Sequence, residues 1–261
     1  MNVLVTGAAS GIGCAVTNYF LEKNHKVYAI DINKVEEKTS LFSFVADITN
    51  EESLRQVKNK LDDIELDVII NVAGIHMMAS LVESDFNKMK RLIDINLCGT
   101  MLVNNVFHSN LIKNGRIIIV TSEVAGFDPM PFNGLYNVSK SALDCYAQAL
   151  RQELNLIDQK VITIRPGAIK TPLSNNSIKD TETLANNTIL YNKQAHKFSR
   201  IAQKFMGTPI PPIKIAKIIY KASTKKHPKL IYKKHQNIGL VLLNILPKRL
   251  QCKIIKMLLN H

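Results

Sequence analysis

The sequence lacks metal-binding motifs, long apolar runs and internal repeats, and each absence excludes a class of protein. The four cysteines, Cys14, Cys98, Cys145 and Cys252, contain no Cys-x-x-Cys pair, and the seven histidines form no pair with metal-ligand spacing. We therefore expect reduced thiols and no structural metal. The apolar run at residues 238–246 is too short to span a bilayer, which needs about 20 residues. No internal repeat or low-complexity linker divides the 261 residues.

Acidic residues are missing from one part of the chain. Residues 191–261 contain 16 Lys and Arg and no Asp or Glu, whereas the first 190 residues contain 18 basic and 21 acidic ones. The formal net charge of +13 thus belongs to the C-terminal quarter. Such a region can attract nucleic acid, an anionic membrane or an acidic substrate, or it can be a solvated lysine surface. The aromatic pattern and groove-reading motifs of nucleic-acid binders are missing, so we expect no nucleic-acid partner.

Length and composition indicate one domain. A chain of this length with 46% hydrophobic residues can bury a sizeable core, and α/β folds of such size are commonly single domains. Residues 1–5 run directly into an apolar strand pattern, with no charged region or cleavage site. We therefore expect no signal peptide and a cytoplasmic protein.

A strand, a glycine-rich turn and a helix follow one another at the start. Residues 3–6 read as a buried strand, Gly-Ala-Ala-Ser-Gly-Ile-Gly occupies 7–13, and 14–23 has a helical pattern. The backbone of such a turn must bend sharply to approach a pyrophosphate, which then binds the free N–H groups of the helix N-terminus. The next strand, 26–30, leads to Asp31, where a carboxylate can bind the adenosine ribose. These features predict a dinucleotide site.

Tyr136 and Lys140 lie four residues apart ahead of an apolar-periodic run. In a helix this spacing puts both side chains on one face. An ammonium beside the phenol favours the phenolate, so we expect the pKa of Tyr136 to fall from about 10 toward the working pH. The tyrosine could then donate or accept a proton. In a lysine-rich chain this spacing alone is also compatible with an exposed helical pair.

Taken in order, these motifs resemble the classical short-chain dehydrogenase/reductase (SDR) family over residues 1 to about 172. The resemblance implies the catalytic residues Asn96, Ser122, Tyr136 and Lys140. Tyr136 would be the acid/base, and Lys140 would lower its pKa and hold the nicotinamide ribose. Ser122 would hydrogen-bond the reacting oxygen, and Asn96 would support a water-linked proton path. Without the resemblance, Ser122 could simply end a strand and Asn96 could cap or bend a helix.

The resemblance also implies a set of cofactor-binding residues at or near strand ends. Besides Tyr136 and Lys140 they are Gly7, Ser10, Gly11, Ile12, Gly13, Asp31, Asp47, Ile48, Asn71, Ala73, Gly74, Pro166, Gly167, Ile169 and Thr171. The family's Asn-Asn-Ala-Gly motif reads Asn-Val-Ala-Gly here, a change from which we expect only a small effect. His76 is left out of the set, because a lone histidine is more often structural.

The alternation of strands and helices predicts an α/β fold with a Rossmann-type doubly wound parallel sheet. Ligands bind beyond the carboxyl ends of the strands in such sheets, so the site residues should converge on one crevice. After Thr171 we expect a polar, irregular segment at 174–187 and a helix at 189–205. The resemblance puts a substrate lid there, after the sixth strand. We expect a later helix at 211–222 and further strands at 42–45, 67–70, 115–122, 161–165 and 229–232.

The end of the chain departs from the pattern of a minimal family member. We predict a dinucleotide-binding domain at 1–236 and a basic, apolar tail at 237–261 that is not an independent domain. The apolar run at 238–246 is followed by Pro247, and then cations alternate with apolar residues. Such a tail could pack against the domain or a partner subunit, or it could lie in a membrane interface.

The resulting expectation is an NAD-dependent oxidoreductase that acts on a hydrophobic secondary alcohol or ketone, such as a steroid, retinol or long-chain alcohol, as a homodimer or homotetramer. NAD is expected because Asp31 would repel a 2′-phosphate and the loop residues Ala8, Ala9 and Ser10 provide no cation. An NADP(H)-dependent carbonyl reductase or 3-oxoacyl thioester reductase is the alternative enzyme. A dinucleotide-sensing binding protein is the alternative without catalysis.

Overall fold

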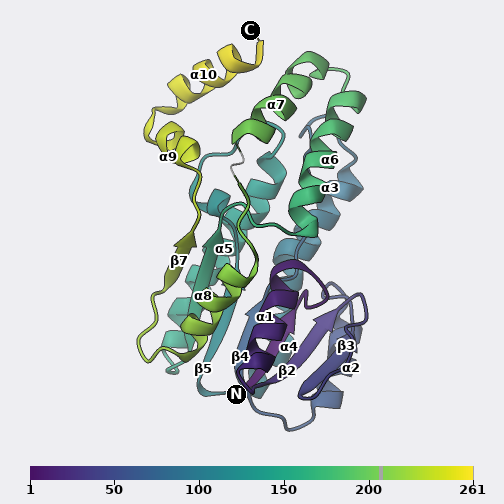
Figure 1. Cartoon of the computed structure of the whole chain (residues 1–261), viewed down its shortest axis with the longest axis vertical. Coiled ribbons are helices and arrows are strands. Elements are labelled where there is room, and N and C mark those ends of the chain that lie inside the picture. Colours follow the sequence, from purple (N-terminus) through teal and green to yellow (C-terminus); the bar gives the residue numbers. More distant parts are fainter. Residues whose placement is uncertain (206–207, 261) are drawn as a thin grey trace.

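The computed structural model describes residues 1–205 and 208–260 and shows a parallel sheet with helices on both faces (Figure 1). Within that part of the chain, one sheet of seven strands has the order β3-β2-β1-β4-β5-β6-β7. The strands are β1 (Asn2–Thr6), β2 (Lys26–Asp31), β3 (Leu41–Val45), β4 (Leu66–Asn71), β5 (Leu111–Val120), β6 (Lys160–Pro166) and β7 (Ile231–Lys234). This order confirms the predicted doubly wound α/β fold in a single domain.

The helices occupy the connections between strands and the end of the chain. They are α1 (Gly11–Glu22), α2 (Glu51–Leu61), α3 (Phe86–Ile93), α4 (Thr100–Phe107), α5 (Gly134–Asn155), α6 (Pro172–Asn187), α7 (Asn192–Phe205), α8 (Ile213–Thr224), α9 (Ile238–Ile245) and α10 (Lys248–Asn260). Among the described residues, no helix has both the length and the apolar character that are needed to cross a membrane.

Two hydrophobic cores lie on the two faces of the sheet. Neighbouring residues of β1 alternate between them, since Leu4 belongs to one core and Val3 and Val5 to the other. Helices α2, α4 and α5 cover the first core, whereas α1 and α8 cover the second. A stretch of strand that is buried on both faces needs apolar residues at every position, which explains the continuous apolar runs at residues 3–5 of β1 and 117–120 of β5. The cores hold the strand ends in fixed positions and so define one edge of the sheet.

The polar segment after β6 is helical, which corrects the expectation of an irregular stretch at 174–187. Helix α6 begins at Pro172, a favoured residue for a first helical turn. Thr171 caps it: its Oγ1 accepts a hydrogen bond from the Ser174 N–H at 3.3 Å, and its own N–H donates to Ser174 Oγ at 3.1 Å. This reciprocal capping supplies the local stabilisation that the weak apolar pattern does not show. The following helix, α7, begins at Asn192 rather than at 189.

The C-terminal segment forms two helices, α9 and α10, beside α7 above the carboxyl ends of the strands (Figure 1). Asp128 anchors both helices. Its N–H donates to Asn244 Oδ1 of α9 at 3.3 Å, and its carboxylate accepts from Gln251 Nε2 of α10 at 3.0 Å. The tail is therefore packed against the domain. His261, its last predicted residue, lies outside the described residues.

Candidate active site

A cavity of about 630 Å³ lies at the carboxyl ends of the strands, below α6, α7, α9 and α10. Most residues predicted from the sequence line it. They are Gly7, Ser10, Gly11, Ile12, Asp31, Asp47, Ile48, Ala73, Gly74, Ser122, Tyr136, Lys140, Pro166, Gly167, Ile169 and Thr171. Gly13, Asn71 and Asn96 do not line it. Residues spread over 165 positions thus meet because parallel strands end at the same edge of the sheet.

The glycine turn after β1 is in close contact with the loop after β4. Gly7 has a φ of +69°, and a Cβ atom there would lie 2.8 Å from the backbone of Ala73. Thr6 Oγ1 accepts hydrogen bonds from the N–H groups of Val72, at 3.2 Å, and Ala73, at 3.3 Å. The two loops are therefore held together, and Ser10, Gly11 and Ile12 at the N-terminus of α1 line the cavity. This cradle fits a pyrophosphate.

Gly13 has a structural position behind that cradle. A Cβ atom there would lie 2.0 Å from the carbonyl oxygen of Gly7. The glycine therefore allows α1 to begin directly against the turn, although it does not line the cavity. The sequence motif correctly indicates a need for glycine, but the need comes from packing between the helix and the turn.

Asp31 ends β2 and is held in place by two backbone groups. Its Oδ2 accepts from the Ala9 N–H at 3.0 Å, and its Oδ1 accepts from the Asn33 N–H at 2.9 Å. A carboxylate has lone pairs for further donors, so Asp31 can still accept hydrogen bonds from ribose hydroxyls. Among the described lining residues, Arg91 and Lys140 are the only lysines or arginines. The sequence interpretation missed Arg91, because α3 carries no motif.

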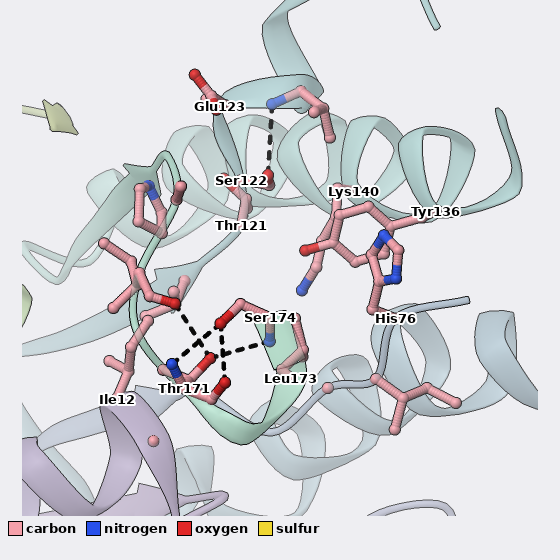
Figure 2. A pocket seen from close by; sticks show the side chains of 18 of the residues that line it. Ile12, His76, Thr121, Ser122, Glu123, Tyr136, Lys140, Thr171, Leu173 and Ser174 are labelled. Atoms are coloured by element: carbon pink, nitrogen blue, oxygen red, sulfur yellow. Dashed lines mark hydrogen bonds between the residues drawn. The ribbon is translucent and has the colours of Figure 1, made fainter. Parts of the chain in front are cut away.

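Tyr136 and Lys140 project from α5 toward the same part of the cavity, with Ser122 opposite (Figure 2). The Lys140 Nζ lies 5.8 Å from the centre of the Tyr136 ring. Burial raises the pKa of Tyr136 to about 12, the hydrogen bond with Ser122 lowers it, and the nearby Glu123 carboxylate raises it. The expected fall in the Tyr136 pKa was therefore wrong for the protein alone. The cost of burying a phenolate is the largest cause of this shift and Lys140 is not among the causes, and burial cannot be read from a four-residue spacing.

Lys140 is also affected by its position. Burial lowers its pKa from 10.5 to about 8, because removing the ammonium from water disfavours the charged form. A Cβ atom on Gly74 would lie 3.3 Å from Lys140 Nζ, which shows how closely the lysine approaches the loop after β4. Tyr136, Lys140 and Ser122 therefore form one buried cluster, in which burial is the largest cause of the pKa shifts of both the tyrosine and the lysine.

Asn96 supports the cavity wall from outside. It is fully buried in a π-helical turn, η1 (Asp94–Gly99), that joins α3 to α4. Its Oδ1 accepts from the Ile75 N–H at 2.8 Å, and its Nδ2 donates to the Ile75 carbonyl at 2.9 Å and to Ser139 Oγ at 3.0 Å. Asn71 is likewise buried, and it donates to Asn104 Oδ1 at 2.8 Å. Both side chains hold backbone and neighbouring helices in place behind the lining.

Two ionisable side chains beside Tyr136 were not among the predicted residues. The His76 ring lies 4.5 Å from the Tyr136 ring, centre to centre, and His76 Nε2 is 3.1 Å from Asn133 Oδ1 (Figure 2). Glu123, next to Ser122, accepts a hydrogen bond from the Asn237 N–H at 2.6 Å, and burial raises its pKa. Adjacency to the Asn-Val-Ala-Gly motif and to Ser122 was the signal that could have identified them.

An apolar part of the cavity wall comes from α7 and from the two helices at the end of the chain. Phe198, Ile201 and Ala202 of α7 line it, and so do Leu240 and Leu243 of α9 and Leu258 of α10. The cavity thus has one half around the strand ends, which includes Asp31, Ser122 and Lys140, and an apolar half below three helices. Among the described residues, no group of three or more His, Cys, Asp or Glu side chains is placed to hold a metal ion.

The fold and the cavity define a dinucleotide-binding protein with a buried serine, tyrosine and lysine. A family model described as short chain dehydrogenase matches residues 1–182. The chain belongs to the short-chain dehydrogenase/reductase family, whose members are NAD(P)-dependent oxidoreductases acting on alcohol or carbonyl groups.

Individual relatives are distant. Short-chain dehydrogenase srdE of Neurospora crassa is 29% identical over 233 residues, which cover 86% of this chain and 79% of that protein. An NADPH-dependent 1-acyldihydroxyacetone phosphate reductase of Schizosaccharomyces pombe is 30% identical over 179 residues, covering 66% of this chain and 60% of that protein. The solved structure of a short chain dehydrogenase family protein from Francisella tularensis is 25% identical with a TM-score of 0.76, covering 89% of this chain and 96% of that chain.

Proposed function

We propose that the protein transfers a hydride between NAD(H) and a hydrophobic secondary alcohol or ketone. The observation that carries this proposal is the continuity of one cavity from the glycine cradle, past Ser122, Tyr136 and Lys140, to the apolar wall of α7, α9 and α10. A reacting carbon beside Tyr136 would have the dinucleotide cradle on one side and the apolar wall on the other. An apolar body with one oxygen fits that arrangement.

The substrate class rests on the apolar half of the cavity. Phe198, Ile201, Leu240 and Leu243 provide no hydrogen-bond donor or acceptor from their side chains. A sugar or other polar substrate would leave its hydroxyls unpaired there, at a cost in binding free energy. The relative from S. pombe is named for a substrate with an acyl chain, which supports a lipid-like carbonyl compound here.

The side chains of the cluster divide the acid/base chemistry among them. In the direction of reduction, the Tyr136 hydroxyl donates its proton to the carbonyl oxygen, and in oxidation the phenolate accepts the proton of the alcohol. Ser122 donates a hydrogen bond to the same oxygen and stabilises the charge that develops on it. Lys140, when protonated, favours the Tyr136 phenolate and binds ribose hydroxyls. The bound nicotinamide supplies or accepts the hydride.

The proposed preference for NAD(H) rests on Asp31. Its carboxylate faces the cavity and is fixed by the Ala9 and Asn33 N–H groups, so it cannot easily turn away from a 2′-phosphate. A phosphate there would meet a fixed negative charge, whereas two ribose hydroxyls would find an acceptor. Arg91 is the lining cation that could offset this effect. Equal or better catalytic efficiency with NADP(H) would overturn the preference.

The test is turnover with a matched panel of hydroxysteroids, retinol, fatty alcohols and their carbonyl counterparts, each with NAD(H) and NADP(H). We expect activity to increase with apolar size and to disappear for sugars. Glucose dehydrogenation faster than oxidation of every lipid-like alcohol would disprove the substrate class. Tight NADH binding without turnover of any compound, in a protein that is folded, would favour the dinucleotide sensor instead.

A further inference from the structure

Helix α9 is apolar on two opposite faces. Its inner face contributes Leu240 and Leu243 to the cavity. Its outer face exposes Ile238, Leu242 and Ile245, with 75%, 61% and 74% of their surface accessible, at the spacing i, i+4, i+7 that defines one side of a helix. The helix has no charged residue. Helices that are apolar all round are normally covered on every side, whereas this outer face is left uncovered by the part of the chain that the structure describes.

Helix α10 continues this surface with positive charge. Lys248, Arg249, Lys253 and Lys256 are all exposed, and among the described residues neither helix has an acidic side chain. The acidic residue that contacts them is Asp128 of the loop before α5, whose Oδ1 lies 3.4 Å from Lys248 Nζ. Exposed Leu250 and Met257 lie on the same helix. The outer surface of the tail therefore combines cations with apolar side chains.

The turn between α6 and α7 adds two apolar residues at the same end of the molecule (Figure 1). Ile189 is 90% exposed and Leu190 is also exposed, although their N–H groups both donate to Glu83 Oε1 at 2.9 Å. The turn is thus held in place with its apolar side chains outward. A hydrogen bond of 3.0 Å from Gln194 Nε2 to Asn260 Oδ1 joins the start of α7 to the end of α10.

We propose that these residues form a docking face for the surface of an anionic lipid bilayer. The docking face consists of Ile189, Leu190, Ile238, Leu242, Ile245, Lys248, Arg249, Leu250, Lys253, Lys256 and Met257. Apolar side chains would enter the boundary of the acyl chains while the cations contact anionic headgroups. A second copy of the chain fits less well, because a symmetric dimer through this face would bring the four cations of each copy together.

The cavity opens beside this face. Leu258 of α10 lines the cavity and yet is 48% exposed, so the cavity wall reaches the surface at this residue. A substrate leaving the bilayer would therefore meet the apolar half of the cavity without crossing water. This role rests on the proposed hydrophobic substrate, but docking itself can be measured without any substrate.

Sedimentation with lipid vesicles tests the proposal on the full chain. We expect the protein to sediment with vesicles of phosphatidylcholine and phosphatidylserine at low salt, and much less at high salt or with phosphatidylcholine alone. Lys253→Gln/Lys256→Gln should lower the partition coefficient by roughly 10- to 30-fold, because each lysine near such a surface contributes on the order of a fivefold factor. Ile238→Ser/Leu242→Ser/Ile245→Ser should lower it by more than about tenfold.

Matched controls come from the opposite end of the molecule. Lys225→Gln/Lys226→Gln removes two exposed cations before β7, and Leu156→Ser/Ile157→Ser removes two exposed apolar side chains after α5. Both controls should sediment like the parent protein. If docking-face and control variants lose equal amounts of vesicle binding, the binding depends on net charge or nonspecific hydrophobic adsorption, and the proposal is overturned.

Two further outcomes would also overturn it. The intact protein could fail to sediment with anionic vesicles at low salt, or the triple serine variant could elute as a smaller species than the parent in size-exclusion chromatography. The second result would make the face an interface between copies of the chain. NADH binding, measured by fluorescence on the same samples, should be unchanged in every variant. If the parent protein itself does not bind NADH, the proposed function is wrong, but the result on membrane docking is unaffected.

Discussion

The two halves of the cavity are built in different ways. The dinucleotide half is shaped by close backbone packing and by hydrogen bonds to the backbone, with Gly7 packed against Ala73 and Asp31 held by two N–H groups. The substrate half consists of apolar side chains from α7, α9 and α10. In the first half a single methyl group would collide with a carbonyl oxygen. In the second half one apolar side chain can replace another at modest cost.

Residues of the dinucleotide half therefore tolerate few substitutions if the cofactor is to bind, whereas residues of the substrate half can change and so select a different substrate. The dinucleotide half follows from local backbone geometry near strand ends, and the substrate half depends on how distant helices pack. Changes in the first half should therefore alter stability or cofactor use, and changes in the second should alter substrate choice. Four experiments test this contrast, beginning with the largest expected effect.

Tyr136→Phe at the junction of the halves should remove most turnover. The substitution deletes only the hydroxyl that exchanges the proton, so we expect a loss of about 100- to 10,000-fold in kcat. NADH affinity and the melting temperature should stay close to those of the parent, because the ring and its contact with His76 remain. Steady-state kinetics and a fluorescence titration measure both. Activity within a few-fold of the parent would contradict the assigned role of Tyr136.

Gly13→Ala should destabilise the dinucleotide half, whereas Gly239→Ala in α9 should not harm the fold. The new methyl group at position 13 would lie 2.0 Å from the Gly7 carbonyl, and such overpacking costs about 1–3 kcal/mol. Gly239 is exposed within a helix, where alanine is favoured by about 0.5–1 kcal/mol. Chemical denaturation should therefore shift in opposite directions for the two variants. A shift in the same direction would remove the contrast between the halves.

Asp31→Ser should exchange cofactor preference without changing the substrate range. The substitution removes the negative charge that repels a 2′-phosphate. It also removes a charged acceptor for the ribose hydroxyls, and a hydrogen bond to such an acceptor contributes about 1.5–3 kcal/mol. We expect NADH to bind roughly 10- to 100-fold more weakly and NADPH to bind better. Titration of both dinucleotides measures this. Arg91→Gln in the same background should weaken NADPH again if the arginine is the compensating charge.

Glu123→Gln should move the pH profile by a small amount. The Glu123 carboxylate raises the pKa of Tyr136, so removing its charge lowers that pKa. The phenolate then forms at lower pH, and the rising limb of alcohol oxidation should shift toward acid. The hydrogen bond that Glu123 accepts from the Asn237 N–H can be kept by the Gln oxygen. An alkaline shift would show that structural change, not charge, dominates.

Much of the fold could be predicted from local patterns. Residues 3–5 of β1 and 117–120 of β5 are all apolar because these parts of the strands are buried on both faces, and the turn at Gly7 needs glycine for its positive φ. These requirements act over a few residues, so the sequence shows them. The start of α6 was also visible in Thr171, Pro172 and Ser174, and the expected irregular segment resulted from relying on apolar periodicity instead of capping.

Other properties depend on the assembled fold and could not be read from the chain. The pKa of Tyr136 is raised because the folded protein excludes water around it, and a motif gives no measure of burial. Leu240, Leu243 and Leu258 line the cavity because contacts with residues far away in the sequence, such as Asp128 and Glu123, hold the tail above the strand ends. The sequence predicted a basic apolar tail but gave no sign that its inner side is part of the site.

The anchoring of the tail by Asp128 and Glu123 also suggests a way in which substrate specificity can change in such a protein. The apolar wall at Leu240 and Leu243 lies outside residues 1–182, the part that matches the family model. Mutations after that point can reshape the chamber for a new molecule while the reaction centre and the nucleotide cradle are inherited unchanged. Exchange of the last 25 residues between paralogues, with Asp128 and Glu123 retained as attachment points, is then a direct route to new specificity.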